Sequence, residues 1–318
     1  MKNMPTTINK KRENLLGEMF KGSKNALRWI EETTKTLDKN NVLLYKIPYT
    51  RRFNYYPTFI ARYGLGNLEM FLETGEEKYK KYFFAQVNWL CNNLVYKNGF
   101  AVWEHHYIFP YYQFDRIPWI HGLGQGLGMT ALLKAYQLSG VNRYLEAAKK
   151  VYNSFEISIK KGGVKFVDDE GNVWLEEYAI LPPPHILNGF ITILFSINEF
   201  YQVTKDESAF EIWDKGINTL KNNLKRYDTG YWSLYDLLNK YPAPLMYHDM
   251  HVHQLGILYR ITGEKIFKDY ELRWKNYMEC KKNRMIAKFS RGIIHLRRHG
   301  IIGSAKRYIQ RKRWERGD

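Results

Sequence analysis

The sequence predicts a mainly α protein, an α/α barrel or toroid of about four helical hairpins with short β-hairpins at one end. Three observations predict it. One pattern recurs four times, the first helix of each repeat is apolar nearly all round, and the second has a single apolar stripe. An all-apolar helix is buried, whereas a one-stripe helix faces solvent. The first helices should therefore form an inner ring. A superhelical array is the alternative, but the first helices lack a polar face, which favours the ring.

The segment before the first repeat is less regular. It contains KNALRWIEE, which has helical patterning, and then NVLLYKIPYTRRFNYYP, which suggests a small β-hairpin. We therefore divide the chain into an N-terminal extension (1–50), a barrel (51–272) and a basic C-terminal tail (273–318).

Each repeat is an apolar helix, a turn and an amphipathic helix. The repeats lie at 64–79, 126–144, 187–210 and 254–267. Their turns fall at Gly75, Gly140, Lys205 and Gly263, at intervals of 65, 65 and 58 residues. Three of these turns carry glycine, the usual residue just after a helix.

Glycine and aromatic residues follow the first three outer helices, at 98–106, 162–178 and 229–237. The second of these stretches contains DDEGN between two strand-like runs, which is a hairpin signal. Each repeat then reads outer helix, strand or hairpin, loop, next inner helix.

Composition favours one large domain or two small ones, since 45% of the 318 residues are hydrophobic. The 25 Tyr and 9 Trp suit either a sugar-binding cleft or core packing. Two cysteines form no disulfide framework, and the N-terminus has no signal-peptide pattern, so we expect a cytoplasmic protein. No apolar run approaches the roughly 18 residues of a membrane span.

The net charge of +17 is concentrated at the C-terminal end. Residues 273–318 hold 15 Lys and Arg against three Asp and Glu. Such a tail suits a polyanion, an anionic membrane surface that would make the protein peripheral to it, or a biosynthetic partner. We do not expect nucleic acid, because no zinc finger or RNP motif is present. A homodimer is compatible with the sequence.

In a ring, all inner helices run in one direction, so the loops entering them gather at one end. These loops lie at 53–57, 116–126, 174–188 and 235–254, and they hold Tyr, Trp, His, Gln, Glu and most of the prolines. Inner-helix N-termini point there too, and a helix N-terminus favours an anionic ligand. We expect the functional site at this end.

These loops carry a resemblance to a known family. EEY followed by prolines and LNGF, then YWSLYDL, then YH with a later His and QL, resembles the C-terminal catalytic domain of D-glucuronyl C5-epimerases, which act on heparosan and heparan sulfate precursors. The segments YYPTFIARYGLGNLEMFLETG and PWIHGLGQGLGMTALLKAYQLSG resemble its earlier helices. The resemblance covers about residues 45–265, in the family's order, and leaves out the basic tail.

The resemblance implies four catalytic residues, Glu177, Tyr178, Tyr235 and Tyr247, around C5 of a uronate. The family often has Arg and His after YDL, where this chain has Leu238 and Asn239. If that arginine binds the carboxylate or a sulfate, this chain must use another group or another polymer.

C5 epimerisation needs proton removal from one face of the sugar and delivery to the other. We choose Glu177 and Tyr247 for this pair, supported by Tyr235 or Tyr178. Charge on the substrate carboxylate needs donors or cations. Candidate substrate-binding residues are Tyr56, Trp119, His121, Gln125, Asn188, His248 and His251. We expect neither a metal nor a cofactor.

Each choice has a plainer alternative. Glu176 and Glu177 could be a solvated strand end, any one tyrosine could be core, and Trp119 could be core or a sugar platform. YHDMHVH could be a metal site by its residue types. GLGQG follows no strand of a βαβ unit, so we do not expect a dinucleotide-binding loop. Its glycines more plausibly allow a close helix approach or a tight helix entrance. We assign Glu176 no role.

Three functions remain to be distinguished. The first is a uronyl C5-epimerase acting on a heparosan-like or other acidic polysaccharide. The second is a polysaccharide lyase or glycoside hydrolase on the same fold, although a hydrolase needs two flanking carboxylates and only one acidic loop is convincing. The third is a non-catalytic polyanion-binding protein.

Overall fold

The computed structural model describes residues 36–46, 52–107, 117–294 and 296–297. Most of the predicted N-terminal extension, including KNALRWIEE, lies outside these residues, as does the chain after 297.

Four helical hairpins make up the described body, as the repeats predict. The inner helices are α2 (Pro57–Thr74), α4 (Gly122–Ser139), α6 (Leu187–Thr204) and α8 (Leu245–Thr262). The outer helices are α3 (Glu77–Asn92), α5 (Asn142–Tyr152), α7 (Glu207–Asn223) and α9 (Lys265–Glu279). The predicted boundary at residue 272 therefore falls inside α9, because this outer helix runs seven residues into the expected tail.

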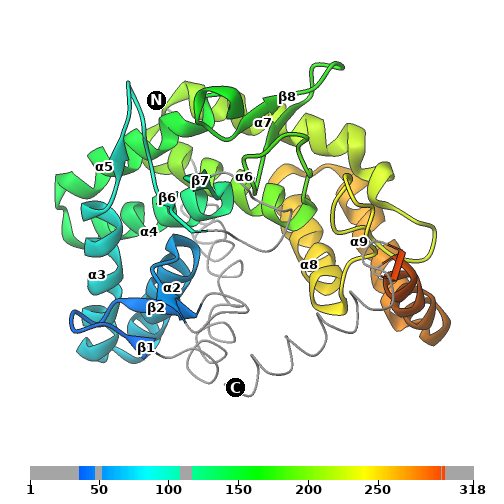
Figure 1. The fold of residues 1–318 in the computed structure, drawn as a ribbon, viewed down its shortest axis with the longest axis horizontal. Helices are drawn as coiled ribbons and strands as arrows, with labels where there is room; N and C mark the ends of the chain where they lie inside the picture. The colour runs from blue at the N-terminus through cyan, green and yellow to red at the C-terminus, as the bar shows by residue number, and fades with distance from the viewer. Residues whose placement is uncertain (1–35, 47–51, 108–116, 295, 298–318) are drawn as a thin grey trace, which may run out of the picture.

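The inner helices follow one another along an arc. α2 packs on α4, α4 on α6 and α6 on α8, while each outer helix packs on its own inner partner. Figure 1 shows α3, α5, α7 and α9 on the outside of this arc. The protein is mainly α, with the two-layer arrangement of an α/α toroid.

All four hairpin turns adopt the left-handed conformation that the sequence pattern requires. The C-cap φ values are 72° at Gly75, 69° at Gly140, 59° at Lys205 and 75° at Gly263. Each C-cap N–H donates to the carbonyl four residues earlier, which ends the helix. Only Lys205 holds this conformation with a side chain.

Burial explains the glycine-rich start of α4, whose residues from Gly122 to Leu133 are all buried. A Cβ at Gly128 would lie 2.4 Å from the Trp103 ring, and one at Gly122 would lie 2.1 Å from the Glu176 carbonyl oxygen. Neither position has room for a side chain, because a ring and a loop lie against α4 there. The close helix approach expected of GLGQG occurs at Gly126, where a Cβ would lie 3.1 Å from Ser196 Oγ on α6.

Short strands connect the hairpins. β8 (Lys165–Val167) and β9 (Val173–Leu175) pair antiparallel around the predicted DDEGN turn. The small sheet before α2 is also present, with β1 (Thr36–Leu37), β2 (Leu43–Lys46) and β3 (Phe53–Asn54) in that order. β4 (Val95–Tyr96) pairs with β5 (Ala101–Val102), and β6 (Glu104–His105) with β7 (Trp119–Ile120). Residues 229–237 form only isolated bridges.

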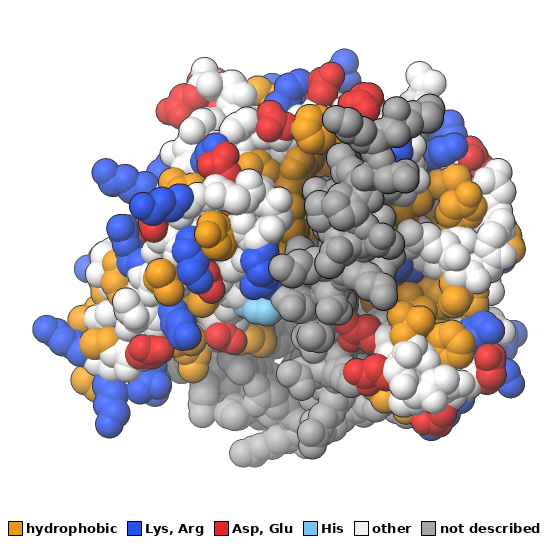
Figure 2. Space-filling view, turned by 180° about the vertical axis from the view of Figure 1, so that it is seen from behind, with side chains coloured by type: hydrophobic (Ala, Val, Ile, Leu, Met, Phe, Trp, Pro, Cys, Tyr) orange, Lys and Arg blue, Asp and Glu red, His pale blue; other side chains and the backbone are white. Residues whose placement is uncertain are grey.

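Charged side chains are distributed widely over the described surface. On the face in Figure 2, Lys and Arg lie around the edge and are interspersed with Asp and Glu. None of the helices in the described ranges is both long and apolar enough to cross a membrane.

Candidate active site

Glu177 lies just after the end of β9, in the loop that leads to α6. The strand stops at Leu175, so the strict alternation of side chains also stops there. The main chain then ties this loop to α4, because Gly122 N–H donates to the Glu177 carbonyl at 2.7 Å. The Glu177 side chain is only 7% exposed, which excludes the solvated strand end.

The two oxygens of the Glu177 carboxylate differ in their hydrogen-bond partners. His121 Nε2 lies 3.3 Å from Glu177 Oε1, whereas Oε2 is buried without a hydrogen-bond partner among the described residues. A buried carboxylate oxygen without a donor is costly. It is also the arrangement expected of a base that must receive a proton.

His121 owes its orientation to α2. Its Nδ1 lies 2.7 Å from the Thr58 hydroxyl, and its ring is almost fully buried. With the hydroxyl donating to Nδ1, the ring carries its proton on Nε2 and donates it to Glu177. Thr58, His121 and Glu177 thus form a chain that joins the first turn of α2, the N-cap of α4 and the loop after β9, which are far apart in sequence.

Gly189 provides the space for the Glu177 carboxylate. A Cβ at Gly189 would lie 2.0 Å from Glu177 Oε2 and 2.7 Å from its Cβ. Gly189 is the third residue of α6, so the carboxylate lies against the N-terminal turn of this helix, where the helix dipole is positive. This glycine is part of LNGF, but its sequence neighbours do not indicate that it lies against Glu177.

Glu176 turns to a different partner from its neighbour. Its carboxylate accepts from the His185 main-chain N–H at 3.0 Å, and its other oxygen lies 2.5 Å from His185 Nδ1. His185 has a positive φ of 50°, and its ring centroid lies 4.1 Å from that of the tilted Trp174 ring. Tyr227 donates its hydroxyl proton to the His185 carbonyl. Glu176 thus fixes the proline segment before α6, a role that the sequence did not assign.

Aromatic residues form a wall beside Glu177. Tyr56, Trp119 and Tyr178 are buried in one cluster with Ile186. Burial, together with nearby Tyr107 and the Glu177 charge, raises the pKa of Tyr56 well above its ordinary value. Trp119 is 4% exposed and stacks on His105 at 4.0 Å, so it lies within the wall and offers no open platform.

Tyr235 and Tyr247 extend this wall towards α8. Tyr235 packs both on the cluster that contains Tyr178 and on the one that contains Tyr247, and its ring centroid is 4.9 Å from that of Tyr247. Burial, followed by the Glu177 charge, raises the pKa of Tyr247, while Arg62 opposes the shift. The four predicted catalytic residues therefore lie together.

Arg62 is a cation that the sequence analysis missed. It lies on α2 one helical turn after Thr58, and thus on the same helix face, and it is half-buried. No hydrogen bond or ion pair within the described residues engages it. A signal was available, because Arg62 is the one charged residue in the apolar run from 57 to 68.

Three predicted substrate-binding residues have hydrogen-bond partners other than Glu177. Gln125 exchanges two hydrogen bonds with the Trp103 main chain, at 3.1 and 3.2 Å. His248 and His251 both contact Ser233 Oγ through Nδ1 at 2.8 Å, and His248 Nε2 lies 2.9 Å from the Trp274 carbonyl. All three are fully buried, so the structure gives them a packing role.

Asn188 begins α6 beside Gly189 and keeps a buried Oδ1 without a hydrogen-bond partner among the described residues. Its main-chain carbonyl accepts from Gln254 at 3.0 Å. Its amide therefore remains a candidate for contact with a ligand at this helix end.

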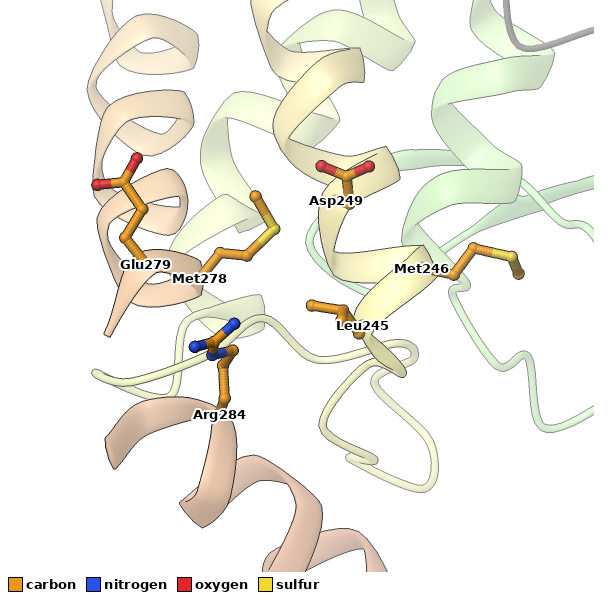
Figure 3. A pocket seen from close by; sticks show the side chains of 6 residues that line it. All are labelled: Leu245, Met246, Asp249, Met278, Glu279 and Arg284. Carbon is orange, nitrogen blue, oxygen red and sulfur yellow. The ribbon is translucent and has the colours of Figure 1, made fainter. Parts of the chain in front are cut away.

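No metal centre emerges from the YHDMHVH segment. Across the described ranges, no three His, Cys, Asp or Glu side chains are grouped so that they could hold an ion. A cavity of about 530 Å³ lies where α8 begins and α9 ends (Figure 3), lined by Leu245, Met246, Asp249, Met278, Glu279 and Arg284. At 100° per residue, Tyr247 leaves α8 on the side opposite Leu245 and Asp249, so this cavity is separate from the Glu177 cluster.

Comparison with solved structures bears on the fold. A family 105 glycoside hydrolase of C. acetobutylicum is 15% identical with a TM-score of 0.51, over 83% of this chain and 76% of that one. At this identity the likeness concerns architecture alone.

Two proteins resemble this chain more strongly in amino-acid sequence. An uncharacterised protein of Methanocaldococcus jannaschii is 33% identical over 179 residues, which are 55% of this chain and 58% of the relative. The D-glucuronyl C5-epimerase of Caenorhabditis elegans is 29% identical over 224 residues, which are 65% of this chain and 36% of the relative. The chain thus spans less than two thirds of the length of either relative.

The matched residues begin after α3, so they take in the last three hairpins up to residue 276 of α9, together with Glu177, Tyr178, Tyr235 and Tyr247. The family model for the D-glucuronyl C5-epimerase C-terminus matches residues 97–276, more than half of the chain. The chain belongs to the D-glucuronyl C5-epimerase C-terminal family.

Proposed function

We propose that the protein is an isomerase that converts D-glucuronate to L-iduronate residues in a heparosan-like or other acidic polysaccharide. One observation carries the proposal, the buried Glu177 carboxylate with one oxygen held by His121 and the other open. Family membership supports the reaction class, and the relative of C. elegans carries the name D-glucuronyl C5-epimerase.

Glu177 is the proposed base. Its Oε2 takes the proton from C5, and the electron pair of the broken C–H bond moves into the substrate carboxylate to give an enolate-like intermediate. His121 holds the other oxygen and keeps the carboxylate in place through Thr58. The buried setting excludes water that would otherwise solvate the base.

Tyr247 is the proposed acid on the opposite face. Its phenol gives a proton to C5, and solvent then returns the proton lost by Tyr247 and removes the one held by Glu177. A tyrosine phenol is protonated at neutral pH, as an acid requires, and burial raises the pKa of Tyr247 further. Tyr235, in ring contact with Tyr247, is proposed to bind the sugar or to donate a hydrogen bond to the enolate-like intermediate.

Arg62 is the proposed partner of the substrate carboxylate. Charge accumulates on this group when C5 loses its proton, and a cation there lowers the barrier. Arg62 is half-buried on the α2 face that holds Thr58, and its charge acts on Tyr247. If the family's arginine after YDL binds this carboxylate, Arg62 would supply the missing charge in this chain, which has Leu238 at that place.

Hydrogen exchange tests this function. Heparosan incubated with the protein in heavy water should gain deuterium at C5, detected by NMR, without chain cleavage. Glu177→Gln and Tyr247→Phe should each reduce exchange by about 10²- to 10⁴-fold, the usual contribution of a general acid or base. The matched control is Glu176→Gln, which removes the neighbouring buried carboxylate and should keep exchange while lowering thermal stability.

Other outcomes would contradict the proposal. Unsaturated chain ends would indicate a lyase, which shares the C5 carbanion but expels the C4 substituent. Full exchange in either variant, with the fold intact by circular dichroism, would remove that residue from the acid–base pair.

A further inference from the structure

The chain continues after α9 as a further helix, here called the basic helix, residues 281–297. It is helical at 281–294 and 296–297, and Figure 1 shows it at the lower right, beyond α9. The basic helix contains six Lys and Arg and no Asp or Glu. The proposed epimerase reaction uses none of these residues.

One face of the basic helix is fixed to the body of the protein. Ala287 is 1% exposed and packs with Trp232 and Ala243. Arg291 donates from Nη1 to the Ala243 carbonyl at 2.7 Å, and the Ser290 and Tyr231 hydroxyls lie 3.3 Å apart. These contacts set which side of the helix faces outwards.

The outward face carries a stripe of large apolar side chains. Met285, Phe289, Ile293 and Leu296 are 59%, 70%, 49% and 46% exposed. They recur every three or four residues, so they align along one side of the helix. Single exposed apolar residues are normal, but an aligned row of four marks an interaction surface.

Exposed cations accompany this stripe. Lys281, Lys282, Arg284, Lys288 and Arg297 are all exposed. At 100° per residue, Lys281 and Lys288 flank the stripe on one side and Arg297 flanks it on the other. If the apolar stripe inserts into a surface, these charged groups can therefore lie at the level of that surface.

We propose that the basic helix docks the protein on an anionic membrane surface. Its apolar row would enter the boundary between headgroups and acyl chains, and its cations would pair with lipid phosphates. A helix with an apolar face, a Lys- and Arg-rich border and few acids is typical of such binding.

Two other partners fit less well. An acidic polysaccharide would attract the cations but would leave the apolar row exposed. A second copy of this helix could cover the row, but it would bring two sets of uncompensated positive charges together, and like charges at an interface are repulsive.

Vesicle sedimentation with the full chain tests the proposal. The protein should bind vesicles of phosphatidylcholine mixed with phosphatidylglycerol and should not bind phosphatidylcholine alone. The triple variant Met285→Ser, Phe289→Ser, Ile293→Ser should lower the partition coefficient at least about tenfold, because each lost apolar group weakens insertion. The matched control is Leu72→Ser, since Leu72 is 69% exposed on α2 and lies outside the basic helix.

Three results would overturn the proposal. The first is equal vesicle binding by the triple variant and the wild type, which would show that charges elsewhere in the chain cause the binding. The second is the absence of wild-type binding to anionic vesicles. The third is a wild-type dimer in light scattering that the triple variant abolishes, which would assign the apolar row to a second copy. C5 exchange on soluble heparosan should be unchanged in the triple variant, so this test is independent of the proposed activity.

Discussion

Two adjacent carboxylates, Glu176 and Glu177, have different roles because the strand before them ends. Glu176 is hydrogen-bonded to His185 and stabilises the segment before α6. Glu177 keeps one oxygen open beside His121. Both are buried, so burial alone does not distinguish the structural acid from the proposed catalytic one, whereas their hydrogen-bond partners differ.

Arg62 gives a prediction at the scale of one residue. Arg62→Met should lower kcat/KM for a uronate polymer by about 10- to 100-fold, because one charge-assisted hydrogen bond is worth about 1.5–3 kcal/mol. Steady-state measurement of epimerisation checks this, and Arg62→Lys should restore part of the loss.

The control for Arg62 is Arg143→Met, which removes an arginine from outer helix α5. It should leave kcat/KM unchanged. Unchanged kcat/KM in Arg62→Met as well would show that the substrate carboxylate binds elsewhere.

The helical hairpin is the element from which the body is built, and its turn is its most demanding position. A residue with a side chain pays a steric penalty in the left-handed conformation, which is why three of the four turns are glycine. Lys205 is the exception, at φ 59°.

Exchanging residues between two turns tests this reading. Lys205→Gly should raise the free energy of unfolding by about 0.5–1 kcal/mol, since it removes the strain of a side chain at positive φ. Gly140→Lys should lower it by about 1 kcal/mol for the opposite reason. Urea denaturation measures both, and destabilisation by Lys205→Gly would show that the Lys205 contacts outweigh the strain.

At the scale of the whole molecule, buried histidines make the stability depend on pH. Burial lowers the pKa of His248 from 6.5 to about 4, and it lowers the pKa of His105 and His251 well below their ordinary value. Between these pH values the unfolded chain binds more protons than the folded one. Stability is therefore complete above about pH 6.5 and is lost as the pH falls towards 4.

His248 should contribute up to about 3 kcal/mol to this loss, at about 1.4 kcal/mol per pKa unit. Urea unfolding at several pH values in this range should show the decline. His248→Gln should be less stable at neutral pH, because it loses the Trp274 and Ser233 contacts, yet should show a shallower decline. The same pH slope as wild type would mean that other groups dominate acid unfolding.

Local signals made much of the fold predictable. The apolar inner helices, the four turns and the DDEGN hairpin depend on helical periodicity, positive φ and turn chemistry, all of which a few neighbouring residues encode. The catalytic candidates were found through the family blocks, which the family model matches over residues 97–276.

The side-chain partners were harder to predict. His248 and His251 have residue types that suit a site, but the loop before α8 folds back and places Ser233 against both rings. Gln125 likewise bonds to Trp103, which lies 22 residues away. Gly189 and Arg62 could not be predicted, because their importance depends on residues distant in sequence, Glu177 for Gly189 and Tyr247 for Arg62.

The sequence by itself determined the repeated hairpins, the end of the barrel at which polar loops collect and the basic C-terminal segment. These follow from periodicity and charge along the chain. Only the tertiary structure decided that Thr58, His121 and Glu177 form one hydrogen-bonded chain, since they are separated by 63 and 56 residues. It also decided that the apolar row of the basic helix faces outwards, because Ala287 and Arg291 fix the opposite face. Spacing along a chain specifies which residues share a helix face, whereas packing between helices determines what that face meets.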